Sequence, residues 1–531
     1  MQTETQPRVI STGTTFVQPV AHVQPFHVRC SAVENLCARV HHSVSFFFPI
    51  RQGADVDQIY ADMRDGLRRT IYEQPIIGGV LRTDERGAFS VELQPAPYAG
   101  VAFHFSDASK DYSFPSFAEL EARGFPFADG DRDGLRELRP DPFPCHEDGE
   151  ATFVAKITHV RGGIVWVASL SHLITDLAQG REIMLRWAHH TKEITNAKGR
   201  ALPLPRQYRL PNRDRLIPKV ERMLEPEELK EASKSLGAYM FLDPTDPEKL
   251  LADIDSIFVK AVLPPNVPAE QATQLMTPTS GIWRFTPAQV NALKEVVKAK
   301  APKGARLSTF DIVTAFVWQR FYLAKRGTST RSPIPRSAQI VTALNVRGRL
   351  NPPLPPNFLG ACVDLVRCTL DEDKLLPPTN TSQENMQNIA NVAGSLRAFG
   401  TQFNEAEYMR LLALSLQTPF CPGLVPKGPI DMLVTDHAMF ADGLAADWGG
   451  ELGRPVALRE PYIERETPRG EVIIFPRQPN GDLDVCVSAE EVVLQRLLAD
   501  GVFQAACDNV FLRHDVVGAF NTLGMSVKAR L

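Results

Sequence analysis

Residues 153–176 read FVAKITHVRGGIVWVASLSHLITD, and this stretch decides the fold. Two apolar runs, 153–160 and 164–170, flank Arg161-Gly162-Gly163, and glycine supplies the positive φ that a tight hairpin needs. His172 follows the second run, and a helix with one apolar face is expected from about 176 to 190. The pattern predicts a buried strand that delivers a histidine where the chain turns into a helix.

Strand and helix patterns alternate along the rest of the chain. Residues 42–50 form an apolar, strand-sized run, and apolar positions at helical spacing follow over 56–71. Residues 84–150 show no clear period. In the second half we expect helices capped by Thr286 and Ser308, a strand over 338–346, helices over 383–399 and 404–416, a hairpin around Asn480-Gly481 and a last helix capped by Ser488. This alternation predicts an α/β, or mixed α+β, fold.

A change of composition divides the chain. Residues 199–219 are basic, rich in proline and aperiodic, which is typical of a semi-rigid connector. With 531 residues, the chain is long enough for two hydrophobic cores. We therefore expect an N-terminal lobe over 1–205, joined by a returning segment 427–446, then a crossover linker over 206–281 and a C-terminal lobe over 282–531.

Composition and charge exclude several classes of protein. Lys+Arg number 58 and Asp+Glu 62, a net charge of −4, whereas nucleic-acid-binding proteins usually carry a basic excess. The chain shows no run of about 18 apolar residues and no secretory pattern, so we expect no membrane span and a cytoplasmic location. The eight cysteines form no CxxC pair, so we expect reduced core thiols and no metal site. Proline exceeds glycine, 42 to 34, which indicates many stiff connectors.

His172 and Asp176 are the candidate catalytic residues. A neutral imidazole is the natural general base for a hydroxyl or an amine, and apolar surroundings keep it neutral. A structural interpretation stands beside this one. A histidine at a strand end is often only a hydrogen-bonded structural residue, and Asp176 with Gln179 three residues later fits a helix cap.

Two further segments are unusual. Residues 447–455 read DWGGELGRP, and three glycines in five positions indicate a tight loop with close backbone approach, without a phosphate-binding glycine pattern. Residues 345–360 read NVRGRLNPPLPPNFLG, in which two arginines precede a stiff proline loop. Arg347 either lies in a solvated turn or pairs with a buried carboxylate.

Together these segments resemble the BAHD acyltransferases, which use acyl-CoA donors. That family carries His-x-x-x-Asp near the end of its first lobe, then an Arg-x-Arg-Leu-x-Pro-Pro-Leu-Pro segment, then Asp-Phe-Gly-Trp-Gly. The counterparts here, in the same order, are His172…Asp176, Arg347…Gly360 and Asp447-Trp448-Gly449. The resemblance covers most of 35–500 and is strongest to the fungal branch, which includes trichothecene 3-O-acetyltransferase.

The resemblance implies two lobes similar to chloramphenicol acetyltransferase, each a mixed sheet flanked by helices, with a tunnel between them. It implies a monomeric enzyme without a permanent cofactor, with acyl-CoA as co-substrate and an alcohol such as a terpenoid or polyketide as acceptor. His172 would be the general base in direct transfer through a tetrahedral intermediate. Asp176 would pair with Arg347; Asp447, Trp448 and Gly449 would shape the tunnel wall in the C-terminal lobe; and Arg306, Ser308 and Thr309 would contact the CoA phosphates.

The chain departs from the family pattern at two places. Gly450-Glu451 stands where the family has Trp-Gly, so the group that stabilises the oxyanion is not assigned. Leu177 follows Asp176 where the family has glycine. Two alternatives remain open: a condensation-type domain that uses carrier-bound thioesters, and a family member that binds a metabolite without catalysis.

Overall fold

The computed structural model describes residues 11–37, 40–85, 87–126, 135–140, 148–210, 212–242, 256–264, 267–327, 337–355, 358–376, 382–417, 424–460 and 469–512. These residues form two compact units. Unit 1 holds those within Met1–Arg213, Asn357–Ala361 and Met439–Glu464, and unit 2 holds those within Asp214–Pro356, Cys362–Ala438 and Arg465–Leu531. The segment that returns to unit 1 is therefore Met439–Glu464 rather than the expected 427–446.

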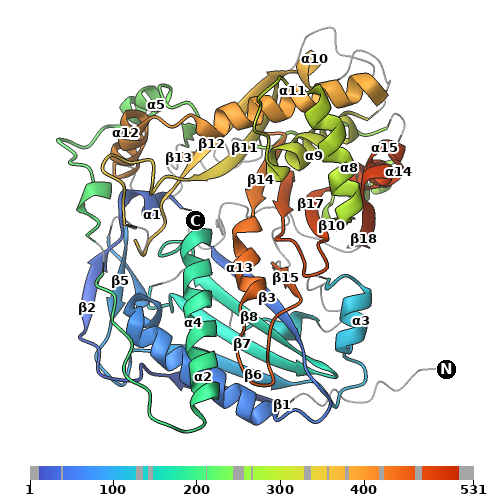
Figure 1. Ribbon diagram of the computed structural model, residues 1–531. Coiled ribbons are helices and arrows are strands. Elements are labelled where there is room, and N and C mark those ends of the chain that lie inside the picture. Colours follow the sequence, from blue (N-terminus) through green and yellow to red (C-terminus); the bar gives the residue numbers. More distant parts are fainter. Residues whose placement is uncertain are drawn as a thin grey trace. The chain divides into compact units, whose positions relative to one another are not determined.

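Unit 1 is built on a six-stranded sheet (Figure 1). In spatial order its strands are β1 (Ser11–Val17), β6 (Val101–Asp107), β7 (Phe153–Val160), β8 (Gly163–Ser171), β3 (His41–Pro49) and β15 (Ala457–Arg459). A smaller sheet joins β2 (Phe26–Arg29), β5 (Phe89–Leu93) and β4 (Val80–Thr83). The predicted hairpin is confirmed: β7 and β8 pair antiparallel, and Gly162 in their connection has a φ of 84°.

Helices α4 (Leu177–Ala197) and α3 (Phe117–Ala122) pack on opposite faces of β8. The other helices of unit 1 are α1 (Ala32–Leu36), α2 (Val56–Glu73), η1 (Pro75–Gly78), η2 (Leu135–Leu138) and α13 (Ala441–Ala445). Trp166 of β8 packs edge-on against Trp187 of α4, with the ring centroids 5.2 Å apart. The alternate residues Val165 and Val167 belong to a core cluster that contains Phe117 of α3. Because side chains alternate along a strand, β8 is buried at every position.

Unit 2 is built on a seven-stranded mixed sheet (Figure 1). In spatial order its strands are β12 (Val363–Asp371), β11 (Ser337–Asn345), β14 (Met432–Asp436), β16 (Glu471–Ile474), β17 (Leu483–Glu490), β10 (Pro278–Phe285) and β18 (Asp508–Leu512), and a separate pair joins β13 (Leu424–Pro426) to β9 (Tyr239–Phe241). The helices are η3 (Asp214–Leu216), α5 (Pro226–Ser233), α7 (Ala269–Leu275), α8 (Pro287–Lys300), α9 (Thr309–Arg326), α10 (Glu372–Leu375), α11 (Ser382–Thr401), α12 (Glu405–Ser415), α14 (Glu491–Ala499) and α15 (Gly501–Ala506). One large apolar cluster joins α8, α9, α11 and α14 to this sheet.

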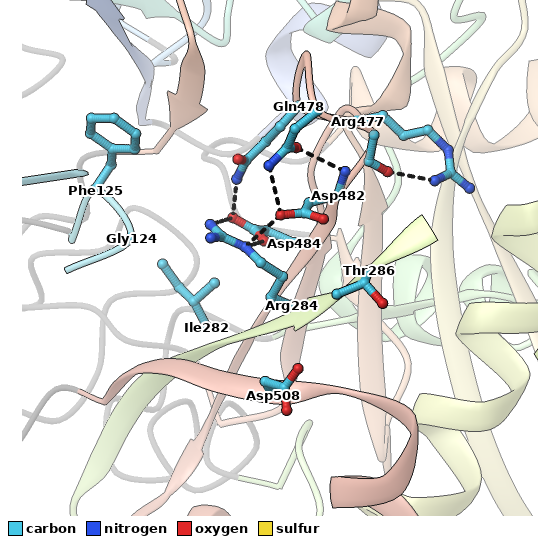
Figure 2. A network of polar contacts seen from close by, with 12 residues as sticks. Gly124, Phe125, Ile282, Arg284, Thr286, Arg477, Gln478, Asp482, Asp484 and Asp508 are labelled. Carbon is cyan, nitrogen blue, oxygen red and sulfur yellow. Dashed lines mark hydrogen bonds and ion pairs between the residues drawn. The ribbon is translucent and has the colours of Figure 1, made fainter. Parts of the chain in front are cut away.

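The hairpin of β16 and β17 is held by a polar network (Figure 2). Arg284 of β10 makes two hydrogen bonds, of 2.8 and 2.9 Å, to the buried Asp484 carboxylate on the neighbouring strand. Gln478 donates from its side chain to Asp484 and from its backbone to the Asp482 carbonyl. The Asn480-Gly481 turn that the sequence predicted lies inside this loop, with Gly481 at a φ of 90°.

Most predicted elements are confirmed, and most of the misses share a cause. The capping boxes at Thr286 and Ser308 are both present. The predicted cap at Ser488 is wrong, because strand pairing with β10 extends β17 to Glu490 and the helix begins at Glu491. The apparently aperiodic residues 84–150 contain β5, β6 and α3. For Ser488, β5 and β6, pairing with a distant strand decided what local pattern could not, whereas α3 begins at a local capping box of Ser116 and Glu119.

Two expectations from composition can be compared with the described residues. Six cysteines there are free thiols, all buried, whereas Cys145 and Cys421 lie outside the described residues. In the part of the chain that the structure describes, no helix combines the length and the apolar character needed to cross a bilayer.

The buried His41 makes the fold sensitive to acid. Burial lowers the pKa of His41 to about 4, although a hydrogen bond to the Ala151 carbonyl opposes this shift. In the unfolded chain its pKa returns to about 6.5, so the unfolded state binds more protons between these values. Stability from the neutral ring is complete above pH 6.5 and is lost as the pH falls towards 4.

We therefore expect His41 to account for a loss of about 2 kcal/mol in unfolding free energy between pH 7 and pH 5. The variant His41→Gln, which does not titrate, should lose correspondingly less over this interval. Urea unfolding of both proteins at the two pH values measures the difference. An identical pH dependence in the two proteins would contradict the assignment.

Candidate active site

His172 lies in the short turn between β8 and α4, as the sequence predicted. Its backbone N–H donates to the Val40 carbonyl at 2.9 Å, which ties the turn to the start of β3. The Ser171 carbonyl accepts from the N–H groups of Ile174 and Thr175, at 3.1 and 3.2 Å. The end of β8 is thus closed into a tight turn, and His172 is held at the edge of the sheet.

Asp176 caps α4. Its side chain accepts a hydrogen bond of 3.1 Å from the Gln179 N–H, and its backbone is extended, as at an N-cap. The structure therefore supports the capping interpretation of Asp176. Asp176 is four residues beyond His172. The first turn of α4, at the positive end of the helix dipole, therefore follows His172 closely in the sequence.

The surroundings of His172 favour a neutral imidazole. Burial lowers the pKa of His172 below its usual value, and this effect outweighs the residue's own backbone and Asp176, which both raise the pKa. The residue is nevertheless partly exposed by surface area. Its Nδ1 is buried, and no other residue in the described part of the chain hydrogen-bonds to it. Nε2 is therefore the nitrogen available to a substrate, and it is unprotonated when Nδ1 carries the single proton.

The loop that contains Asp447, Trp448 and Gly449 belongs to unit 1, not to the C-terminal lobe in which we expected it. The Trp448 side chain is buried among the rings of Phe48, Trp166 and Trp187, with centroid separations of 5.2 to 5.8 Å. This aromatic cluster draws the loop into the core of unit 1. The sequence did not reveal it, because the four rings come from segments far apart in the chain.

Asp447 and Gly449 fasten the loop to the second half of α4. Asp447 forms an ion pair of 2.8 Å with Lys192, which lowers the pKa of the carboxyl group, and it accepts from the Gly449 N–H at 3.0 Å. A Cβ at Gly449 would lie 2.8 Å from the Lys192 Cα. Since Lys192 is sixteen residues beyond Asp176, the loop contacts α4 about 24 Å along the axis from the cap. It therefore fixes the helix and does not touch His172.

Glu451, at the position that departs from the family pattern, is also structural. Its carboxylate forms an ion pair with Arg51 and accepts from the Asp55 N–H at 2.8 Å. Asp55 is the N-cap of α2. The carboxylate thus connects the glycine loop to the start of α2.

Arg347 lies in unit 2, directly after β11. Its guanidinium and its backbone N–H both donate to the side-chain oxygen of Asn345, at 3.3 and 3.1 Å, and the residue is buried. Its carbonyl accepts from the Leu354 N–H at 2.9 Å, so Arg347 also anchors the proline loop. The solvated-turn interpretation is therefore wrong, and the pairing with Asp176 stays a prediction.

The candidate CoA residues surround the start of α9 in unit 2. The Ser308 hydroxyl donates to the Asp311 carboxylate at 2.8 Å and accepts from the Asp311 N–H at 3.1 Å. Arg306 is exposed and Thr309 is partly exposed. The capping role of Ser308 is established by these contacts, whereas a phosphate contact by any of the three residues stays a prediction.

One group on α4 has the residue types of a metal site. Among the described residues, His189, His190 and Glu193 are the only set whose ligand atoms lie close enough together to share an ion. His190, however, is bonded through Nε2 to Glu73 at 2.6 Å and through Nδ1 to Glu193 at 3.2 Å. Both of its nitrogens are therefore engaged by carboxylates of unit 1.

Comparison with known proteins identifies a family model and relatives that match most of the chain. A model of the Transferase family matches residues 8–392. The acyltransferase easC of Emericella nidulans is 25% identical over 494 residues, covering 91% of this chain and 95% of its own length. The acyltransferase clz6 of Cochliobolus lunatus is 23% identical, covering 86% of this chain and 90% of its own.

Solved structures share the fold at low sequence identity. The F. graminearum TRI101 structure with coenzyme A and deoxynivalenol aligns with a TM-score of 0.63 at 16% identity, covering 91% of this chain and all of that one. Vinorine synthase aligns with a TM-score of 0.59 at 14% identity, covering 94% of this chain and 98% of that one. The predicted two-lobed mixed fold is confirmed.

The neutral state of His172 predicts the pH dependence of turnover. Because its pKa lies below about 6.5, the basic form persists as the pH falls to that value, and activity is lost only below it. We expect the acid limb of the kcat/KM profile to have an apparent pKa below 6.5. Steady-state rates between pH 4.5 and 8 measure it, and a limb at or above 6.5 would exclude this electrostatic account.

The glycine loop predicts a selective loss of stability. In Gly449→Ala, a φ of 84° and the close Lys192 backbone should lower the unfolding free energy by about 1–3 kcal/mol. Gly394→Ala is the matched control, because Gly394 lies inside α11 with open space around it, and alanine there should stabilise by up to about 1 kcal/mol. Thermal unfolding separates the two, and equal stability of both variants would contradict the packing described for the loop.

Proposed function

The chain belongs to the Transferase family of BAHD acyltransferases, and on this premise we propose that it transfers an acyl group from acyl-CoA to a hydroxyl of a specialised metabolite. The general activity is acyl transfer, since the matched family and the relatives aligned over most of their length are acyltransferases. One observation carries the proposal: a partly exposed histidine whose pKa is lowered stands between the end of β8 and the start of α4.

In the proposed reaction, His172 Nε2 removes the proton from the acceptor hydroxyl as its oxygen attacks the thioester carbonyl carbon. The carbonyl oxygen becomes a tetrahedral oxyanion, and preorganised donors at such a position contribute roughly 3–4 kcal/mol each. Collapse of the intermediate breaks the carbon–sulfur bond. The CoA thiolate then takes the proton from the His172 imidazolium, which restores the neutral base.

The proposed cycle requires two properties of His172, its protonation state and the orientation of its ring. The base must be unprotonated when the alcohol binds, which the lowered pKa provides. It must also present one nitrogen in a fixed direction, and the burial of Nδ1 favours Nε2 for this role. The buried cysteines are not required, because the acyl group passes directly to the acceptor.

We assign supporting roles to other residues on the same basis. Asp176, besides capping α4, would pair with Arg347. Arg306 and Thr309, together with the backbone at Ser308, would contact CoA phosphates at the start of α9. Asp447, Trp448 and Gly449 would act on the site only through the position of α4.

The substrate classes come from the structural neighbours. TRI101 structures hold coenzyme A together with T-2 or with deoxynivalenol. These complexes support acyl-CoA as the donor and a small-molecule acceptor for this chain, and we propose a hydroxylated terpenoid or polyketide as that acceptor. Glu451 does not stabilise the oxyanion, because its carboxylate only accepts hydrogen bonds and is engaged by Arg51 and the Asp55 N–H.

Replacing the base tests the proposal. With acetyl-CoA and a panel of terpenoid and polyketide alcohols that includes deoxynivalenol, wild-type protein should release CoA thiol and form an ester visible by mass spectrometry. His172→Ala should lower the rate by at least about 100-fold, the lower range for general base catalysis. His27→Ala is the matched control, because His27 is an exposed histidine on β2.

Full activity of His172→Ala would overturn the proposed mechanism. Acyl transfer from a phosphopantetheine carrier protein, with none from acyl-CoA, would favour the condensation-type alternative. Tight binding of acyl-CoA without turnover across the panel would favour a non-catalytic family member.

A further inference from the structure

His42 contacts the candidate base from the neighbouring strand. β3 pairs antiparallel with β8, and the register places His42 opposite Leu170, two residues before His172. The two imidazole rings meet edge to face, with centroids 5.5 Å apart and an interplanar angle of 66°. Among the described residues, this is the only ring contact that His172 makes.

A hydrogen bond fixes the direction of the His42 ring. Its Nε2 lies 2.9 Å from the Thr175 hydroxyl oxygen. The same hydroxyl lies 3.0 Å from the Ser171 carbonyl oxygen. The Thr175 side chain thus joins the His42 ring to the turn that carries His172, whichever ring tautomer is present.

The other side of the His42 ring is bounded by α4. A Cβ at Gly180 would lie 2.9 Å from the His42 Cε1 atom, closer than real Cβ contacts allow. Glycine at this position, in the first turns of α4, is therefore what permits the helix backbone to lie against the ring. The ring is held between the helix and the turn that carries His172.

We propose that His42 is a positioning residue for His172, an inference that rests on the proposed function. The His42 ring packs against the His172 ring and so limits rotation of the His172 side chain about its χ1 and χ2 bonds. Rotation would turn Nε2 away from the acceptor hydroxyl. Misplacement of a reacting group by about 1 Å costs on the order of 100-fold in rate, so loss of this ring contact should lower kcat.

Four variants at and beside this contact test the proposal. His42→Ala removes both the ring and the hydrogen bond, and kcat should fall about 10- to 100-fold while KM for acetyl-CoA stays within about twofold. His42→Phe keeps a ring against His172 and should recover most of kcat. His42→Gln keeps a hydrogen-bonding group for Thr175 without a ring and should not recover kcat. Gly180→Ala, which replaces neither histidine, should displace the His42 ring and lower kcat in the same way.

His41→Gln is the matched control. His41 precedes His42 on β3, is buried, and bonds to the Ala151 carbonyl rather than to the turn. His41→Gln should alter the pH dependence of the unfolding free energy and leave kcat within about twofold of the wild-type value at pH 7.5. All variants are assayed with acetyl-CoA and the alcohol of the panel that gives the highest wild-type rate, at a temperature where circular dichroism shows each to be folded.

Three results would overturn the proposal: an unchanged kcat in both His42→Ala and Gly180→Ala, an equal loss of kcat in His41→Gln, or a rise in KM for acetyl-CoA with kcat unchanged. If His42→Ala fails to fold, Gly180→Ala and His42→Phe decide the matter. Failure of the proposed function is distinguishable, because it would show as full activity of His172→Ala whatever the His42 variants do.

Discussion

The backbone carbonyl of Ser171 holds together the turn on which the site depends. It accepts from the N–H groups of Ile174 and Thr175 and from the Thr175 hydroxyl, at distances of 3.0 to 3.2 Å. These bonds close the chain within five residues, so that β8 ends and α4 begins with His172 between them. His172 therefore shares the rigidity of a central strand and of a long helix, although it belongs to neither.

That arrangement requires α4 to be fixed along its whole length. The helix has 21 residues, about 31 Å, and its start is held by the Asp176 cap. Its middle is held by Trp187 against Trp166, and its second half by the loop 447–453, which returns from late in the sequence. The departure from the family pattern at Gly450-Glu451 is compatible with this role, because Glu451 ties the loop to α2 by an ion pair.

The sequence predicted the local features of this site and missed the distant ones. The two apolar runs, the Arg161-Gly162 turn and the Asp176 cap are encoded within a few neighbours, so the order strand, His172, helix followed directly. The contact between His42 and His172 depends on the register of β3 against β8, and the burial of Trp448 depends on three other rings brought together by folding. Neither the ring contact nor the burial of Trp448 can be predicted from the spacing of residues in the sequence. For the same reason, the glycine loop was expected in the wrong lobe and the cap at Ser488 was wrong.

The central claim is that the protein holds His172 neutral near pH 7, with its proton on Nδ1 and Nε2 open to substrate. The most direct measurement is an NMR titration of the ¹⁵N-labelled histidine side chains, with the His172 signals identified by their absence in His172→Ala. The account predicts a His172 pKa below 6.5 and, at neutral pH, nitrogen shifts of the Nδ1–H tautomer. A pKa at or above 6.5, or a proton on Nε2 in the free enzyme, would contradict it.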